Sequence, residues 1–263
     1  MNSSTHTHNR ISTLFAAKAR NVLSVYFTAG FPRCNDTTTI ICALERAGAD
    51  MVEIGIPYSD PIADGPTIQE SSAQALRNGM TLELLFEQLR DIRSHVELPL
   101  VLMGYVNPLL QFGMERFCAC CAEIGIDGVI VPDLPVEEYQ HSYATLFQQH
   151  HLANILLVTP QTPDQRIQDL DRVSEGFLYA VSSAGTTGKV LTIDAEREQY
   201  FERLTRLGLQ NPVMIGFGIA DKTSFDAACR YAQGAIVGSA FITMLAQSIS
   251  LAEDIKRFIA EMR

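Results

Sequence analysis

The chain has 263 residues, of which 47% are hydrophobic and 19% charged, and this balance supports a large buried core rather than a disordered chain. Its formal net charge of −10 argues against nucleic acid or an anionic membrane surface as a partner, because both attract clustered lysine and arginine. The polar N-terminus and the absence of a long apolar run predict a cytoplasmic protein with neither a signal peptide nor a membrane span.

The first expected element is an amphipathic helix that precedes the first strand. Ile11, Leu14, Phe15 and Ala19 have the spacing of one helical face. We expect this extra helix to cover the N-terminal end of the fold, and we expect residues 1–10 to be flexible.

Short apolar runs bounded by Gly, Pro or Asp then alternate with segments of helical periodicity, which is typical of a parallel sheet with crossover helices. Eight strands close a barrel, and the eight expected here are Leu23–Thr28, Met51–Ile54, Leu100–Met103, Gly128–Val131, Ile155–Val158, Phe177–Val181, Pro212–Ile215 and Ala235–Val237. We therefore predict an α/β fold, a single (β/α)8 TIM barrel domain over residues 1–263. A doubly wound open sheet is the alternative, but the first strand is not followed by its glycine-rich fingerprint.

Two of the connecting helices have clear ends. Thr37–Ala47 has apolar residues at helical spacing and precedes Gly48, a typical C-cap. A second helix is expected to begin near Met114 and to stop at Gly125.

The six cysteines and six histidines do not indicate a disulfide framework or a metal site. Cys118, Cys120 and Cys121 crowd one predicted helix, and the others lie far away in sequence, so we expect reduced, structural thiols. The histidine pairs at positions 6 and 8 and at 150 and 151 lack further ligands nearby, and we predict no metal.

The densest group of unusual residues, Val52–Pro66, follows the second expected strand. Its prolines limit the freedom of the loop, as suits a loop that holds side chains over a cavity. Glu53 lies in an otherwise apolar strand, where burial of an inward carboxyl would raise its pKa and prepare it for proton transfer near neutral pH. An outward Glu53 paired with a basic helix residue is the alternative. Asp64 is either a second functional carboxylate or the cap of the next helix, and Asp60 suits a turn or a surface contact.

Glycines follow the last three expected strands, in Ser182–Gly188, Gly216–Ile219 and Gly238–Ala240. In barrels, the loops after strands seven and eight commonly form a phosphate site with a short helix N-terminus, where backbone N–H groups hold the anion. Such a site would let an acidic chain bind an anionic substrate, although turn geometry alone also favours glycine. The segment Ser182–Gly188 is also suited to a lid.

Bulky residues at strand ends could line an apolar pocket beside the anion site, although each of them also suits ordinary barrel packing. They are Tyr26, Met103, Tyr105, Tyr179 and Phe217.

The order of these motifs resembles that of the tryptophan synthase alpha subunit family. Besides Val52–Pro66, the match includes T-A-G-F-P, G-Y-V-N-P, V-P-D-L-P, S-S-A-G-T-T-G, G-F-G-I and G-S-A, and only about the first ten residues fall outside it. The resemblance implies a lyase of tryptophan biosynthesis that reversibly cleaves indole-3-glycerol phosphate to indole and glyceraldehyde 3-phosphate, with no cofactor in this subunit.

The resemblance also implies residue roles. Glu53 matches the catalytic glutamate that protonates the indole C3, and Asp64 matches the aspartate that stabilises positive charge at the indole N–H. Tyr179 falls beside the glutamate, and Thr187 on the lid threonine that meets the aspartate. The phosphate-binding positions are Gly188, Phe217, Gly218, Gly238 and Ser239, and the indole pocket is Tyr26, Met103 and Phe217.

The family pattern further implies a beta subunit that carries pyridoxal phosphate and receives indole through a tunnel in an alpha-beta-beta-alpha heterotetramer. The expected contact residues are Pro57, Asp60, Asn107 and Pro108. The chain departs from the common lid pattern S-R-x-G-V-T-G, because Ser183 replaces the arginine and Thr186 the valine. Both positions bear on lid closure and on allosteric communication with the partner.

Two other functions stay open at this point. The chain could be a catalytically weak activator of a beta subunit, although the presence of both carboxylates argues against this hypothesis. It could also be another phosphate-binding barrel, such as an isomerase of a phosphorylated sugar or indole precursor, which would leave the Val52–Pro66 loop unexplained.

Overall fold

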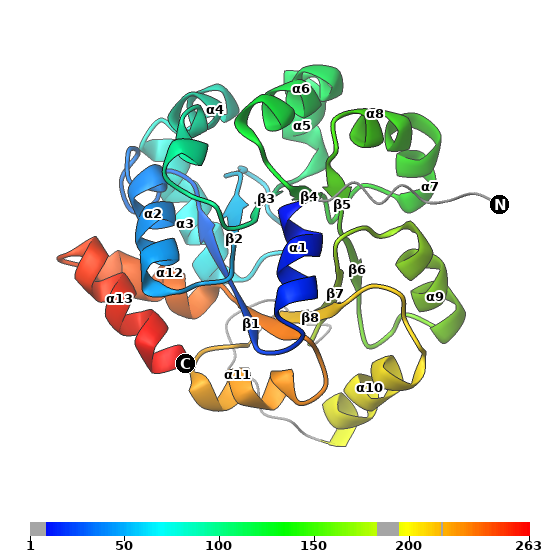
Figure 1. The fold of residues 1–263 in the computed structure, drawn as a ribbon. Coiled ribbons are helices and arrows are strands. Elements are labelled where there is room, and N and C mark those ends of the chain that lie inside the picture. The colour runs from blue at the N-terminus through cyan, green and yellow to red at the C-terminus, as the bar shows by residue number, and fades with distance from the viewer. Residues whose placement is uncertain (1–8, 183–194, 217) are drawn as a thin grey trace.

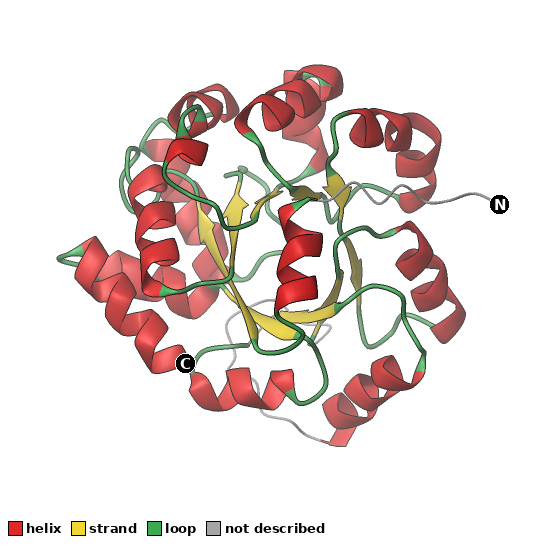
Figure 2. Cartoon of the chain, viewed as in Figure 1, coloured by secondary structure: helices red, strands yellow, loops and turns green. Residues whose placement is uncertain are grey.

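A computed structural model describes residues 9–182, 195–216 and 218–263. Thr187, Gly188 and Phe217 of the expected site, and the two lid departures Ser183 and Thr186, lie outside the described residues. The described chain forms a ring of parallel strands surrounded by helices (Figures 1 and 2). The predicted (β/α) barrel is therefore confirmed.

Nine strands are assigned in the described residues, in the order β5-β4-β3-β2-β1-β9-β8-β7-β6. Their bounds are β1 Val22–Thr28, β2 Met51–Gly55, β3 Leu100–Met103, β4 Gly128–Ile130, β5 Ala153–Asn154, β6 Leu156–Val158, β7 Leu178–Val181, β8 Val213–Gly216 and β9 Gly234–Val237.

The fifth expected strand is split into β5 and β6 at Ile155. The Ile155 N–H still donates to the Val129 carbonyl of β4 at 3.0 Å, whereas the Leu156 N–H donates to the Ser174 hydroxyl at 3.0 Å. The chain thus exchanges β4 for β7 as its partner within one residue. Because β5 and β6 are the two ends of the strand order, this covalent link closes the ring.

The helices lie outside the strand ring, apart from α1 (Figure 2). Their bounds are α1 Arg10–Ala17, α2 Thr37–Ala47, α3 Pro66–Arg77, α4 Leu82–Leu89, α5 Val106–Phe112, α6 Met114–Ile124, α7 Val136–Glu138, α8 Ala144–Gln149, α9 Asp164–Val173, α10 Ala195–Arg206, α11 Lys222–Cys229, α12 Ser239–Gln247 and α13 Leu251–Met262, with a 3-10 turn at Ile92–Ser94 and a π-helical turn at Tyr139–Tyr143. The predicted bounds of α2 and α6 are confirmed, and Gly48 and Gly125 after them are left-handed, with φ of 94° and 83°.

Alternation along the strands separates two apolar layers. Side chains such as Phe27 of β1 and Leu102 of β3 point outward and pack against the helices. The side chains at the alternate positions, such as Val22, Met51 and Val101, point inward and fill the ring. Because a parallel barrel buries both faces of its strands, nearly every strand residue is buried, and a carboxylate among them is conspicuous.

Helix α1 lies across one end of the strand ring (Figure 1). Ile11 is fully buried among the side chains that fill the ring, which confirms the expected covering helix. The helix ends at Ala17, and Ala19 is exposed rather than part of its apolar face.

The expectation of flexible residues 1–10 extended too far at its C-terminal limit. Asn9 caps α1 by accepting from the Ser12 N–H, and its amide donates to the Asp127 carbonyl at 3.1 Å. Arg10 forms an ion pair with the same Asp127 at 3.2 Å. These contacts make Asn9 and Arg10 part of the fold.

All six cysteines lie in the described ranges and are unpaired. No helix in the part of the chain that the structure describes is long and apolar enough to cross a membrane.

Candidate active site

Glu53 lies inside the barrel, on β2, between Tyr26 of β1 and Val101 of β3 in the strand register. Its side chain is fully buried. The Ser24 hydroxyl donates to Oε1 at 2.8 Å, and Oε2 has no hydrogen-bond partner among the described residues. Burial raises the pKa of Glu53 to about 7, although the hydrogen bond from Ser24 opposes the shift. The outward, ion-paired alternative for Glu53 is therefore wrong.

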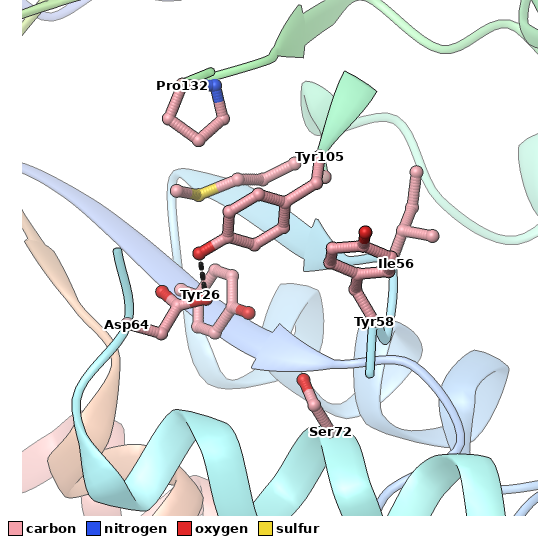
Figure 3. Close-up of a pocket in the computed structure, with 9 residues that line it drawn as sticks. Tyr26, Ile56, Tyr58, Asp64, Ser72, Tyr105 and Pro132 are labelled. Atoms are coloured by element: carbon pink, nitrogen blue, oxygen red, sulfur yellow. Dashed lines mark hydrogen bonds between the residues drawn. The ribbon is translucent and has the colours of Figure 1, made fainter. Parts of the chain in front are cut away.

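Asp64 lies in the loop between β2 and α3, beyond the carboxyl end of β2. Its Oδ2 accepts a 3.0 Å hydrogen bond from the Tyr105 hydroxyl (Figure 3). Burial raises the pKa of Asp64 to about 6, and the hydrogen bond from Tyr105 acts in the opposite direction. Helix α3 is preceded by Gly65 at its N-cap position, without a side-chain cap. Asp64 is thus directed at the pocket rather than used as the helix cap.

Two tyrosines connect the carboxylates electrostatically. Burial raises the pKa of both Tyr26 and Tyr179, and the negative charges of Glu53 and Asp64 raise these pKa values further. Tyr26 pairs with Glu53 in the strand register and lines the same pocket as Asp64. Tyr26, Glu53 and Asp64 therefore lie together toward the carboxyl end of the strands, which is where barrel enzymes carry their active sites.

Glycines provide the room for both tyrosines. A Cβ atom on Gly55 would lie 2.2 Å from the Tyr26 hydroxyl oxygen, and one on Gly216 would lie 2.1 Å from that of Tyr179. Neither position tolerates a larger side chain without displacement of the ring. Gly55 and Gly216 are thus required by the close approach of a side chain rather than by a positive φ.

A pocket opens beside these groups, and Figure 3 shows the Tyr105 hydroxyl directed at Asp64 within it. It is lined by Tyr26, Ile56, Tyr58, Asp64, Ser72, Met103, Gly104, Tyr105 and Pro132. Tyr26 and Met103 of the expected indole pocket therefore share one cavity with a candidate catalytic carboxylate. Three of the lining residues are tyrosines, Tyr26, Tyr58 and Tyr105, and aromatic walls are common in the binding sites of flat ligands.

The described part of the expected phosphate site lies after β8 and β9. Gly218 has a φ of 80°, a conformation that favours glycine, and Gly238 directly precedes α12, which begins at Ser239. A Cβ atom on Gly238 would lie 3.4 Å from the Tyr26 ring. The N-terminal end of α12, where free N–H groups favour an anion, is therefore adjacent to the pocket wall.

Tyr105 is the residue whose role the sequence did not indicate. From the sequence, Tyr105 was expected only as one of several bulky residues at strand ends. Its contact with Asp64 joins positions 41 residues apart, and no local pattern signals such a pair.

The expected partner residues lie in two neighbouring segments. Pro57 is buried in the fold, whereas Asp60 and Asn107 are exposed and Pro108 is half-buried at the start of α5. The Asn107 amide donates to the Tyr58 hydroxyl at 3.4 Å, so the loop after β2 contacts α5. Both segments carry exposed apolar side chains, with Ile62 84% and Leu110 49% exposed.

Comparisons with known proteins agree with this architecture. The family model of the tryptophan synthase alpha chain matches residues 13–262. The tryptophan synthase alpha chain of Flavobacterium johnsoniae is 54% identical over 244 residues, covering 93% of this chain and 96% of the relative. That of Parabacteroides distasonis is 49% identical over 255 residues, covering 97% and 99%. A crystal structure of tryptophan synthase subunit alpha from Legionella pneumophila has a TM-score of 0.88 at 31% identity and covers 97% of both chains. The chain belongs to the tryptophan synthase alpha chain family.

Proposed function

We propose that the chain is the lyase subunit that reversibly cleaves indole-3-glycerol phosphate into indole and glyceraldehyde 3-phosphate. The observation that carries the proposal is Glu53, a buried carboxyl with one oxygen held by Ser24, the other without a described partner, and a pKa raised to about 7. Such a group can both give and take a proton near neutral pH. Membership of the family places the chain in tryptophan biosynthesis as the alpha subunit.

The proton balance of the cleavage suits one such group. Protonated Glu53 gives its proton to the indole C3, which turns the ring into a cationic indolenine. The side-chain hydroxyl next to the ring then loses its proton, the C–C bond breaks, and the bond electrons restore the indole while the hydroxyl becomes the aldehyde carbonyl. Glu53, now ionised, helps to remove this hydroxyl proton, so the carboxyl ends the cycle as it began.

Asp64 would stabilise the cation at the indole nitrogen. Protonation at C3 leaves positive charge on the ring N–H, and an ionised carboxylate at the pocket wall lowers the energy of that intermediate. Its position in the pocket with Tyr26 and Met103 supports this role. Tyr179 would support Glu53, and Thr187 would contact Asp64 when the lid closes.

The substrate phosphate would bind at the glycines that follow the last strands. The described residues Gly218, Gly238 and Ser239 offer backbone N–H groups and the N-terminus of α12, and Gly188 and Phe217 would complete the site. Phe217 would also close the indole pocket. This arrangement explains why an acidic chain needs no lysine or arginine for its anionic substrate.

We further propose that indole passes to a beta subunit in an alpha-beta-beta-alpha heterotetramer. Pyridoxal phosphate would belong to that subunit, and this chain would use no cofactor or metal of its own. Asp60, Asn107 and Pro108 would contact the partner, with the exposed Ile62 and Leu110 adding apolar area. Buried Pro57 would shape the loop rather than contribute its own surface.

The test is indole release from indole-3-glycerol phosphate by the purified chain, alone and with its beta subunit. We expect slow release that rises strongly with the partner, and loss of release in the Glu53→Gln variant. A folded chain that binds the beta subunit but releases no indole in either condition would overturn the proposal. Normal stimulation of the partner by a Glu53→Gln, Asp64→Asn variant, without wild-type lyase activity, would favour the activator hypothesis.

A further inference from the structure

The loop that carries Asp64 is held by a side chain from the following β/α unit. Tyr105 precedes α5, directly after β3 and Gly104. Its hydroxyl accepts a 3.0 Å hydrogen bond from the Ala63 N–H and donates one of 3.0 Å to Asp64 Oδ2. One oxygen atom therefore fixes the backbone of the loop and the orientation of its carboxylate together. Figure 3 shows the bond to Asp64.

The other described hydrogen bonds of Asp64 act on its backbone. The Asp64 N–H donates to the Pro61 carbonyl at 3.1 Å, and the Gln69 amide donates to the Asp64 carbonyl at 2.8 Å. Neither bond determines where the carboxylate points. Ile62 and Ala63 are exposed, so packing restrains this part of the loop little.

Tyr105 is itself held firmly. Its side chain is only 6% exposed, and its ring packs on that of Tyr58 with centroids 5.2 Å apart. The next residue, Val106, donates its N–H to Asp133 at 2.9 Å, which fixes the start of α5. A rigid donor of this kind can hold a carboxylate in one orientation before the substrate binds, so no further conformational entropy is lost when it binds.

From these contacts we infer that Tyr105 is a positioning residue, which acts through Asp64 by directing the carboxylate at the cationic indole nitrogen. The inference rests on the proposed function. It assigns Tyr105 no contact with the reacting atoms, so its effect should disappear when Asp64 is replaced.

The first test is Tyr105→Phe, which removes the hydroxyl and keeps the ring on Tyr58. We expect kcat to fall about tenfold or more, with a smaller change in KM. The variant loses the hydrogen bond that orients the charged Asp64 carboxylate, and this carboxylate acts on the cationic intermediate rather than on substrate binding. Tyr231→Phe is the matched control, since its hydroxyl donates to the exposed Glu198 at 2.9 Å, and it should retain wild-type kcat. An unchanged kcat in Tyr105→Phe would overturn the inference.

A double-mutant cycle with Asp64→Asn separates positioning from a general loss of structure. If Tyr105 acts through Asp64, adding Tyr105→Phe to Asp64→Asn should lower the residual kcat less than twofold. The same tenfold loss in both backgrounds would show that Tyr105 acts elsewhere.

The pH dependence of the single variant gives an independent readout. The Tyr105 hydrogen bond lowers the pKa of Asp64, so its removal should move the acidic limb of the kcat/KM profile to higher pH. The other titratable groups around this pair are Tyr26, Glu53, Tyr58, Asp133 and Tyr179. A limb at the wild-type pH would contradict the inference. Absence of indole release by the wild-type chain would instead contradict the proposed function.

Discussion

The Ser24 hydroxyl donates a 2.8 Å hydrogen bond to one oxygen of Glu53, and the other oxygen is buried without a hydrogen-bond partner among the described residues. This division of the carboxyl has two consequences. One oxygen fixes the orientation of the group, and the other can exchange a proton. Its burial also makes ionisation of the group costly.

Glu53→Gln should abolish most of the proposed lyase activity. Glutamine keeps the shape and can still accept from Ser24, but it cannot transfer a proton, so kcat should fall by at least about a hundredfold. Steady-state indole release checks this expectation, with the exposed Glu123→Gln as the matched control. A smaller loss would contradict the assignment of Glu53 as general acid.

The same substitution should change how stability depends on pH. The pKa of Glu53 rises from 4.5 to about 7 on folding, so the folded chain holds a proton that the unfolded chain releases in this window, and stability falls as pH rises through it. Glu53→Gln lacks this titration. Its free energy of unfolding relative to wild type should increase by up to about 3 kcal/mol across the window. Urea unfolding at several pH values measures this, and a difference that does not vary with pH would show that Glu53 is not buried as described.

The pH profile of kcat/KM should be bell-shaped and narrow. In the proposed mechanism Asp64 is ionised when it stabilises the cation, so the rate should rise through a pKa of about 6. Glu53 is protonated when it acts as the acid, so the rate should fall above a pKa of about 7. Asp64→Asn should remove the lower limb only. A flat profile between these values in the wild type would count against this pair of roles.

Gly55→Ala should disturb the pocket through Tyr26. The added methyl group would lie 2.2 Å from the Tyr26 hydroxyl oxygen, and overpacking of this kind costs about 1–3 kcal/mol. We expect a lower melting temperature together with a raised KM. Combining it with Tyr26→Leu, which withdraws the ring, should recover part of the lost stability. If the double variant is less stable than the sum of the two single changes predicts, the clash is not the cause.

Asp127→Ala should loosen helix α1 from the end of the barrel. Asp127 is 3% exposed and accepts hydrogen bonds from Arg10, Arg93 and the Leu100 N–H. Its removal leaves the half-buried Arg93 without its carboxylate, which costs about 3 kcal/mol. Chemical unfolding measures the loss, and Asp169→Ala, which breaks an exposed ion pair, should cost less than about 1 kcal/mol. Equal losses of stability in the two variants would contradict this role of Asp127.

Much of the site was predictable because it lies in local patterns. A carboxylate in an apolar strand, the prolines after it and glycines at successive strand ends are visible within a few residues, and Glu53, Asp64 and Gly238 all lie where those patterns indicated. Tyr105 was not assigned to Asp64, because that contact depends on the spatial adjacency of two loops. The split of the fifth strand was also missed, since it results from a change of pairing partner at Ile155.

The sequence by itself determined the alternation of strands and helices, because apolar periodicity and glycine stops act over one element at a time. It also determined which residue types could carry acid/base chemistry. Only the tertiary structure decided that Glu53 faces inward with one oxygen held by Ser24, and that Asp64 is held by Tyr105. Side-chain direction in a barrel and the resulting pKa values depend on ring closure and burial, which arise when distant strands and loops meet.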